Sequence, residues 1–213
     1  MVFLLTIPSS VGLVVLGQSI IGAIYQGGKF TTHDTQQTAL ALSCYAIGLA
    51  GYSALKVINP AFYALHDART PMIVSLLSIL VNYAVAATML EAIGLGHAGL
   101  ALSTSAVAIF GSVALFIILR NRIGGIHGRE LFSSLWRIAV ASLAMGGVVW
   151  LSSHFMLQRF GHRALAHLAN LTVSIPLGLI VLYGVARALR IAELDLAMRA
   201  FLGPVMRRLR PAR

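Results

Sequence analysis

Six apolar stretches, each close to the length that a helix needs to cross a bilayer, dominate this sequence of 213 residues. A transmembrane helix needs about 20 predominantly apolar residues, because each residue adds only about 1.5 Å along the helix axis. The stretches lie at residues 2–24, 38–65, 71–90, 98–119, 135–156 and 165–189. They predict an all-α, polytopic membrane protein, with about six transmembrane helices over residues 1–190 and a basic cytoplasmic tail over residues 191–213.

The composition excludes a water-soluble domain. Hydrophobic residues make up 58% of the chain and charged residues 10%, whereas about 25% of the residues of a typical soluble domain are charged. A soluble protein covers its surface with polar groups, and this sequence has too few of them. Its apolar side chains are therefore expected to face membrane lipids.

The basic residues are distributed as in a membrane protein. A nucleic-acid-binding protein clusters its cations on one folded face with aromatic residues between them, and here they occupy the gaps between apolar stretches. With six spans, twelve arginines fall on the side of the C-terminus, and Lys29, Arg159 and Arg163 on the other. The twelve are Arg69, Arg120, Arg122, Arg129, Arg137, Arg187, Arg190, Arg199, Arg207, Arg208, Arg210 and Arg213. The positive-inside rule then places both termini in the cytoplasm, and no nucleic-acid partner is expected.

Two short motifs predict where helices begin. Asp34 and Gln37 have the spacing of a capping box before the second stretch. Thr70 and Pro71 open the third stretch, where threonine suits the N-cap and proline the first helical position.

Lys56 is the residue that most suggests a function. It lies about nine residues before the end of the second stretch, roughly 13 Å deep at about 1.5 Å per residue. Asn59 and Tyr63 share its helix face, and Pro60 interrupts the backbone hydrogen bonds beside them. A cation at this depth either faces a hydrated cavity or extends to the interface. Lys56, Asn59 and Tyr63 are therefore candidate cavity-lining residues.

Asn82 is a further candidate, since it lies in the middle of the third stretch. It either lines the same cavity or makes a hydrogen bond between helices, as asparagine often does in lipid. Gln18 and Ser19 in the first stretch have the same two interpretations.

The sequence contains no motif for catalysis, for a cofactor or for a metal site. Paired carboxylates, a phosphate-binding glycine loop and a histidine pair at helical spacing are all missing from it. We therefore expect neither enzymatic activity nor a cofactor.

Several segments, in this order and spacing, resemble the C-terminal part of the MurJ/MviN family of lipid II flippases, within the wider group of polysaccharide and multidrug exporters. The most specific are residues 56–64 (KVINPAFYA) and 67–71 (DARTP). The others are residues 5–9 (LTIPS), 27–31 (GGKFT), 45–49 (YAIGL) and 97–103 (HAGLALS).

The resemblance implies a two-lobed protein of fourteen spans, of which this chain would supply about the last six. The missing N-terminal lobe of the same protein is then an expected partner, in agreement with a first apolar stretch that begins at Val2 without a basic anchor. The cationic residues that hold the substrate in this family lie largely in the earlier spans, so none is transferred here. The implied function is transport of the lipid-linked peptidoglycan precursor, lipid II, across the bacterial cytoplasmic (inner) membrane for cell wall synthesis.

Two other functions are also compatible with the sequence. One is an exporter of the same superfamily for another lipid-linked oligosaccharide or for a drug. A drug exporter should carry carboxylates inside its spans, and the six acidic residues here lie in loops, at stretch ends or in the tail. The other is a membrane scaffold that packs against a partner chain and transports nothing.

Overall fold

The computed structural model describes residues 2–25, 30–91, 96–124, 128–160 and 164–189, and all of its long elements are α-helices. Each helix is long and apolar enough to cross a membrane. The helices are α1 (Val2–Tyr25), α2 (Thr32–Ala64), α3 (Arg69–Glu91), α4 (Gly96–Arg122), α5 (Gly128–Phe160) and α6 (Ala164–Ala188). The predicted all-α class and its six membrane-spanning helices are confirmed. The predicted tail, residues 191–213, lies outside the described residues.

Helix α2 begins at Thr32 and not at residue 38, because a polar first turn precedes the predicted apolar stretch. Thr31 is the N-cap: its backbone N–H donates to Asp34 Oδ2 at 2.9 Å, and its hydroxyl accepts from Asp34 N at 3.3 Å. The predicted box of Asp34 and Gln37 is therefore wrong by one turn. Asp34 supplies the acidic half of the motif rather than the cap.

The start of α3 is organised by Asp67. Its carboxylate accepts the backbone N–H groups of Arg69 and Thr70, both at 3.1 Å, and the Thr70 hydroxyl at 2.6 Å. It also forms an ion pair with Arg122 at the end of α4, at 2.7 Å. The predicted N-cap at Thr70 is therefore wrong, because Asp67 satisfies the free N–H groups of the first turn.

This arrangement predicts a pH dependence. The Thr70 hydroxyl, the Thr70 backbone N–H and the nearby Arg122 hold the pKa of the Asp67 carboxyl below its ordinary value of 3.8. A lowered pKa stabilises the folded state above that ordinary value, and the stabilisation is lost as the pH falls through the lowered one. We expect Asp67→Asn to lower the unfolding temperature in detergent at neutral pH. The difference between the unfolding temperatures of the variant and the wild type should disappear below pH 3.8. A difference in unfolding temperature that does not change with pH would show that the charge of Asp67 contributes nothing to the stability of the fold.

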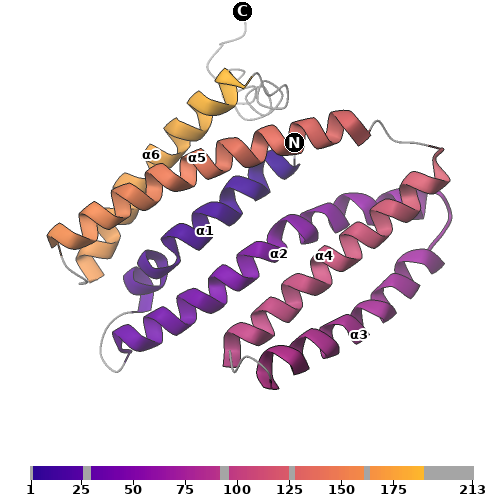
Figure 1. The fold of residues 1–213 in the computed structure, drawn as a ribbon, viewed down its shortest axis with the longest axis horizontal. Helices are drawn as coiled ribbons and strands as arrows, with labels where there is room; N and C mark the ends of the chain where they lie inside the picture. Colours follow the sequence, from indigo (N-terminus) through magenta and orange to yellow (C-terminus); the bar gives the residue numbers. More distant parts are fainter. Residues whose placement is uncertain (1, 26–29, 92–95, 125–127, 161–163, 190–213) are drawn as a thin grey trace, which may run out of the picture.

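The helices lie side by side in a slanted row, with α1 and α2 at its centre (Figure 1). Helix α2 packs on α1 and α4, and α3 packs on α4 at one end of the row. Helices α5 and α6 pack on each other and on α1 at the other end. Helix α3 is the least buried span, so most of its apolar surface faces away from the bundle.

A close contact joins α2 and α4 through small residues. The Gly48 N–H donates to Ser105 Oγ at 3.1 Å, and the Ser105 hydroxyl donates to the Cys44 carbonyl at 2.6 Å. One turn further along α2, Gly51 lies against the backbone of Ala108. Small residues allow helix backbones to approach closely in lipid, where packing replaces hydrophobic collapse.

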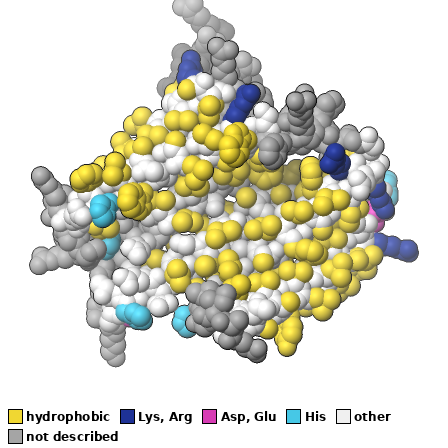
Figure 2. Space-filling view, in the orientation of Figure 1, with side chains coloured by type: hydrophobic (Ala, Val, Ile, Leu, Met, Phe, Trp, Pro, Cys, Tyr) yellow, Lys and Arg dark blue, Asp and Glu magenta, His cyan; other side chains and the backbone are white. Residues whose placement is uncertain are grey.

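The surface has the character of a membrane protein. Figure 2 shows hydrophobic side chains across the face of the bundle, and Lys and Arg side chains along its upper and right margins. Large apolar side chains such as Leu80 and Leu143 are two-thirds exposed. Burial within this bundle therefore covers only part of the apolar surface, and lipid or further protein must cover the rest.

Candidate functional site

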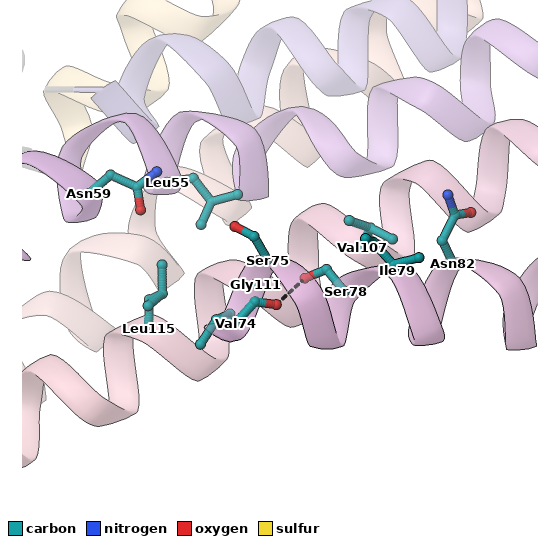
Figure 3. A pocket seen from close by; sticks show the side chains of 10 residues that line it. All are labelled: Leu55, Asn59, Val74, Ser75, Ser78, Ile79, Asn82, Val107, Gly111 and Leu115. Carbon is teal, nitrogen blue, oxygen red and sulfur yellow. Dashed lines mark hydrogen bonds between the residues drawn. The ribbon is translucent and has the colours of Figure 1, made fainter. Parts of the chain in front are cut away.

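A hollow with a cavity volume of about 240 Å³ lies where α2, α3 and α4 meet, and both apolar and polar side chains line it. Helices α2 and α3 form its walls and α4 its floor, as Figure 3 shows. It is lined by Leu55, Asn59, Val74, Ser75, Ser78, Ile79, Asn82, Val107, Gly111 and Leu115. These side chains offer amide and hydroxyl groups and carry no charge, so the hollow suits a neutral hydrogen-bonding group better than an ion.

Two of the four predicted cavity-lining residues line this hollow. Asn59 of α2 and Asn82 of α3 lie toward opposite ends of it (Figure 3). Asn59 Oδ1 is buried and has no hydrogen-bond partner among the described residues. The Ser78 hydroxyl, by contrast, donates to the Val74 carbonyl of its own helix at 2.8 Å. The amide of Asn59 is therefore the group in the hollow that most needs a partner.

Lys56 and Tyr63 do not line the hollow. Both are exposed on α2, Tyr63 by 58%. Lys56 lies eight residues before the last residue of α2, about 12 Å along the axis at about 1.5 Å per residue. Of the residues of α2, the hollow is lined by Leu55 and Asn59. A role for these two residues in a cavity stays a prediction.

A second polar group, which the sequence prediction missed, joins α1, α5 and α6. Asn170 of α6 is fully buried, and its amide N–H groups donate to Ser19 Oγ and Ser153 Oγ, both at 2.8 Å. The Ser174 hydroxyl donates to Asn170 Oδ1 at 2.8 Å. A lone asparagine inside an apolar stretch was the available signal, the same one that marked Asn82. Ser19 here makes the contact between helices that was one of its two interpretations.

No group of three or more potential metal-ligating side chains occurs in the described part of the chain. The carboxylate of Asp67 is engaged with Thr70 and Arg122. The described residues offer polar contacts between helices and a hollow, which occur in helical transporters, in channels and in other membrane bundles.

Comparison with known families decides between these classes. The family model described as lipid II flippase MurJ matches residues 1–171. The chain belongs to the MurJ lipid II flippase family. This family consists of transporters and not of enzymes, and the predicted resemblance to it is confirmed.

Individual relatives extend the match over most of the chain. A probable lipid II flippase MurJ from Rickettsia prowazekii (strain Madrid E) is 29% identical over 196 residues, covering 90% of this chain and 38% of the relative. Another from Bdellovibrio bacteriovorus is 30% identical over 193 residues, covering 91% and 36%. A solved structure of lipid II flippase MurJ in an inward closed conformation superposes with a TM-score of 0.66 at 27% identity, covering 88% and 37%. The chain thus spans little more than a third of the length of these MurJ proteins.

Proposed function

We propose that this chain is one part of a flippase that moves lipid II from the cytoplasmic to the outer leaflet of the bacterial inner membrane. The observation that carries the proposal is the family match over residues 1–171, on a chain whose six helices are all long and apolar enough to span a bilayer. The remaining part of the flippase, with its N-terminal lobe, would come from outside these 213 residues.

The physical task explains why such a protein needs a hydrated, cationic path. Lipid II carries a sugar–pyrophosphate headgroup, and an unpaired charge in hydrocarbon is prohibitively costly. Fixed cations in a water-filled cavity between two lobes offset that cost, and rocking of the lobes exposes the cavity to each leaflet in turn. In this proposal Lys56 adds positive potential at the edge of the cavity.

The proposed orientation has both termini in the cytoplasm. Arg69 opens α3, Arg120 and Arg122 close α4, and Arg187 lies in the last turn of α6. Because successive helices run in opposite directions across a membrane, these ends lie on the same side. Their shared positive charge supports a cytoplasmic position for that side.

The function can be tested by measuring how much lipid II is accessible at the outer leaflet of cells depleted of their own flippase. We expect the chain expressed with the rest of its flippase to restore the accessible lipid II, and the chain alone to restore none. If the complete assembly leaves lipid II inside while remaining folded in the membrane, the substrate assignment is wrong. Transport of another lipid-linked oligosaccharide by the same assembly would then identify the exporter alternative.

The same assay tests Lys56. With an effective dielectric constant near 20, a cation about 10 Å from a phosphate contributes about 1–2 kcal/mol, which corresponds to a rate change of roughly tenfold. We expect Lys56→Ala in the complete flippase to slow lipid II transport by about that factor, and Lys56→Arg to retain most of it. Arg120→Ala is a matched control at the helix end. A Lys56→Ala variant with normal transport would remove Lys56 from the mechanism.

A further inference from the structure

We propose that α5 holds the bilayer around it thin, through two bands of exposed side chains that belong at the level of the lipid headgroups. The first band consists of Trp136 and Arg137, and the second of Trp150, His154 and Gln158. The partner of this surface is the phospholipid bilayer itself. The inference goes beyond the proposed function, because it concerns the lipids around the chain and holds whatever the chain transports.

An exposed stripe of α5 runs from the first band to the second. Helices α5 and α6 form one end of the row of helices (Figure 1). Along the stripe Trp136 is 65% exposed, Leu143 67% and Trp150 58%. Intervals of seven residues are close to two helical turns, so these three side chains lie on one face of α5. Gly147 lies on the same face, and nothing among the described residues comes within 4 Å of a Cβ atom added there.

The second band is a ladder of side chains one helical turn apart. The rings of Trp150 and His154 stack with their centroids 5.5 Å apart and an angle of 10° between their planes. Gln158 Nε2 and His154 Nε2 are joined by a hydrogen bond of 2.9 Å. All three side chains are exposed, and an imidazole and an amide that face hydrocarbon lose their hydrogen bonds to water at a high cost. These groups therefore belong among the lipid headgroups.

The inner side of α5 is polar at the same level. Ser153 accepts a hydrogen bond from the amide of Asn170 at 2.8 Å, and the hydroxyls of Ser152 and Ser174 lie 3.2 Å apart. The polar ladder on the outer side of α5 therefore continues, through these two serines, into the contact between α5 and α6. Two independent sets of contacts thus place the end of the apolar part of α5 near residue 151.

The first band has the composition of the opposite interface. Trp136 and Arg137 are adjacent, and both are exposed. Tryptophan is enriched at membrane–water interfaces, and a guanidinium in hydrocarbon is costly unless it extends to the headgroups. Trp136 and Trp150 are the two tryptophans of the whole chain. Their positions at opposite ends of one apolar stripe mark the two interfaces that the stripe has to join.

The stripe is too short for an ordinary bilayer. The two tryptophans are 14 residues apart, about 21 Å at about 1.5 Å per residue, whereas the hydrocarbon core of a bilayer is about 30 Å thick. From Arg137 to His154 there are 17 residues, or about 26 Å. In α4, by contrast, His97 and Arg120 are 23 residues apart, or about 35 Å. Any tilt of α5 makes its span across the membrane shorter still.

Thinning of the bilayer accommodates this mismatch better than movement of the side chains. Helix α5 has 33 residues, so its apolar stripe and not its length limits the span. A short apolar span is met by a thinner bilayer or by flanking side chains that extend to the interface. Arg137 has a long stem and can extend, but the short side chain of His154 is held between Trp150 and Gln158. The bilayer beside α5 is therefore about 21–26 Å thick.

Tryptophan fluorescence tests this thickness, because both tryptophans lie on α5. The full chain would be reconstituted in vesicles of brominated 18-carbon phosphatidylcholine, which quenches tryptophan on contact. Unbrominated phosphatidylcholine with monounsaturated chains of 14, 18 or 22 carbons would replace half of the brominated lipid. The lipid that fits α5 best displaces the brominated lipid most, and the recovered fluorescence measures that displacement.

We expect the 14-carbon lipid to bind beside α5 about threefold better than the 22-carbon lipid, because each ångström of mismatch carries a modest cost. The 18-carbon lipid should lie between them. Equal recovery with all three lipids, or the greatest recovery with 18 or 22 carbons, would overturn the inference. Fluorescence that the brominated lipid does not quench would also overturn it, because protein rather than lipid would then cover the stripe.

A variant with a longer apolar stripe provides the second arm. His154→Leu combined with Gln158→Leu extends the stripe by up to two turns, or about 12 Å, and should move the preference to the 18-carbon lipid. Both replaced side chains are exposed, so the bundle should stay folded. Thr172→Val changes an exposed polar residue of α6 and should keep the preference for 14 carbons. A double variant that keeps the preference for 14 carbons would overturn the role of the second band.

The lipid II assay separates this result from the proposed function. Lipid II transport by a flippase whose α5 shows no preference for short lipids would reject the thin bilayer alone. A preference for short lipids without lipid II transport would reject the substrate and retain the thin bilayer.

Discussion

Gly51→Leu is expected to force α2 away from α4 and to destabilise the bundle by about 3 kcal/mol or more, as overpacking against a backbone does. A Cβ atom at Gly51 would lie 2.8 Å from both the carbonyl carbon and oxygen of Ala108 and 2.9 Å from Ile109 N. These are backbone atoms of a neighbouring helix, so no side-chain rotation relieves the clash. Thermal unfolding in detergent should show a midpoint lower by roughly 6–12 °C.

Gly147→Leu is the matched control for this change. It places the same side chain on a glycine of α5, where nothing lies within 4 Å of the added Cβ atom. Both substitutions also replace a poor helix former with a good one, which by itself stabilises a helix by about 0.5–1 kcal/mol. Gly147→Leu should therefore leave the midpoint unchanged or raise it. Equal midpoints for the two variants would mean that α2 and α4 do not approach this closely.

The spans could be predicted from the sequence because each apolar stretch has to match the bilayer by its own length, whatever its neighbours are. The contact between Gly51 and Ala108 could not be predicted in this way. Glycines such as Gly48 and Gly51 allow another helix to come close, but hydropathy contains no information on which helix approaches. The predicted capping residues of α2 and α3 were wrong for a related reason. Thr31 and Asp67 lie outside the apolar stretches, and the length of an apolar stretch contains no information on the residues before it.

The candidate site was predicted in part. Asn59 and Asn82 were predicted from their polarity inside apolar stretches, and the structure brings them to one hollow. The spacing of Lys56, Asn59 and Tyr63 establishes a shared face on α2, but it cannot tell where a neighbouring helix leaves a gap on that face. The gap depends on α3 packing against α4 rather than α2, which is a long-range property.

Asn170→Leu is expected to loosen α6 from α1 and α5. The substitution keeps the branched shape of the side chain but removes the donors to Ser19 and Ser153 and the acceptor for Ser174. Hydrogen bonds between helices contribute about 0.6 kcal/mol each on average in a membrane, and up to about 1.7. Loss of the two bonds between helices, to Ser19 and Ser153, therefore costs about 1–3 kcal/mol. The measurement is again the unfolding midpoint in detergent.

Thr172→Val shows whether the effect comes from the network rather than from any polar group on α6. The Thr172 hydroxyl is exposed and donates only to the Leu168 carbonyl of its own helix, at 2.9 Å. Its replacement should change the stability by less than about 0.5 kcal/mol, as is usual for a surface substitution. A double-mutant cycle of Ser19→Ala with Asn170→Leu then isolates the bond between α1 and α6. Residues that share a hydrogen-bond network show coupling of about 0.5–3 kcal/mol, so strictly additive effects would mean that Asn170 stabilises α6 without holding it to α1.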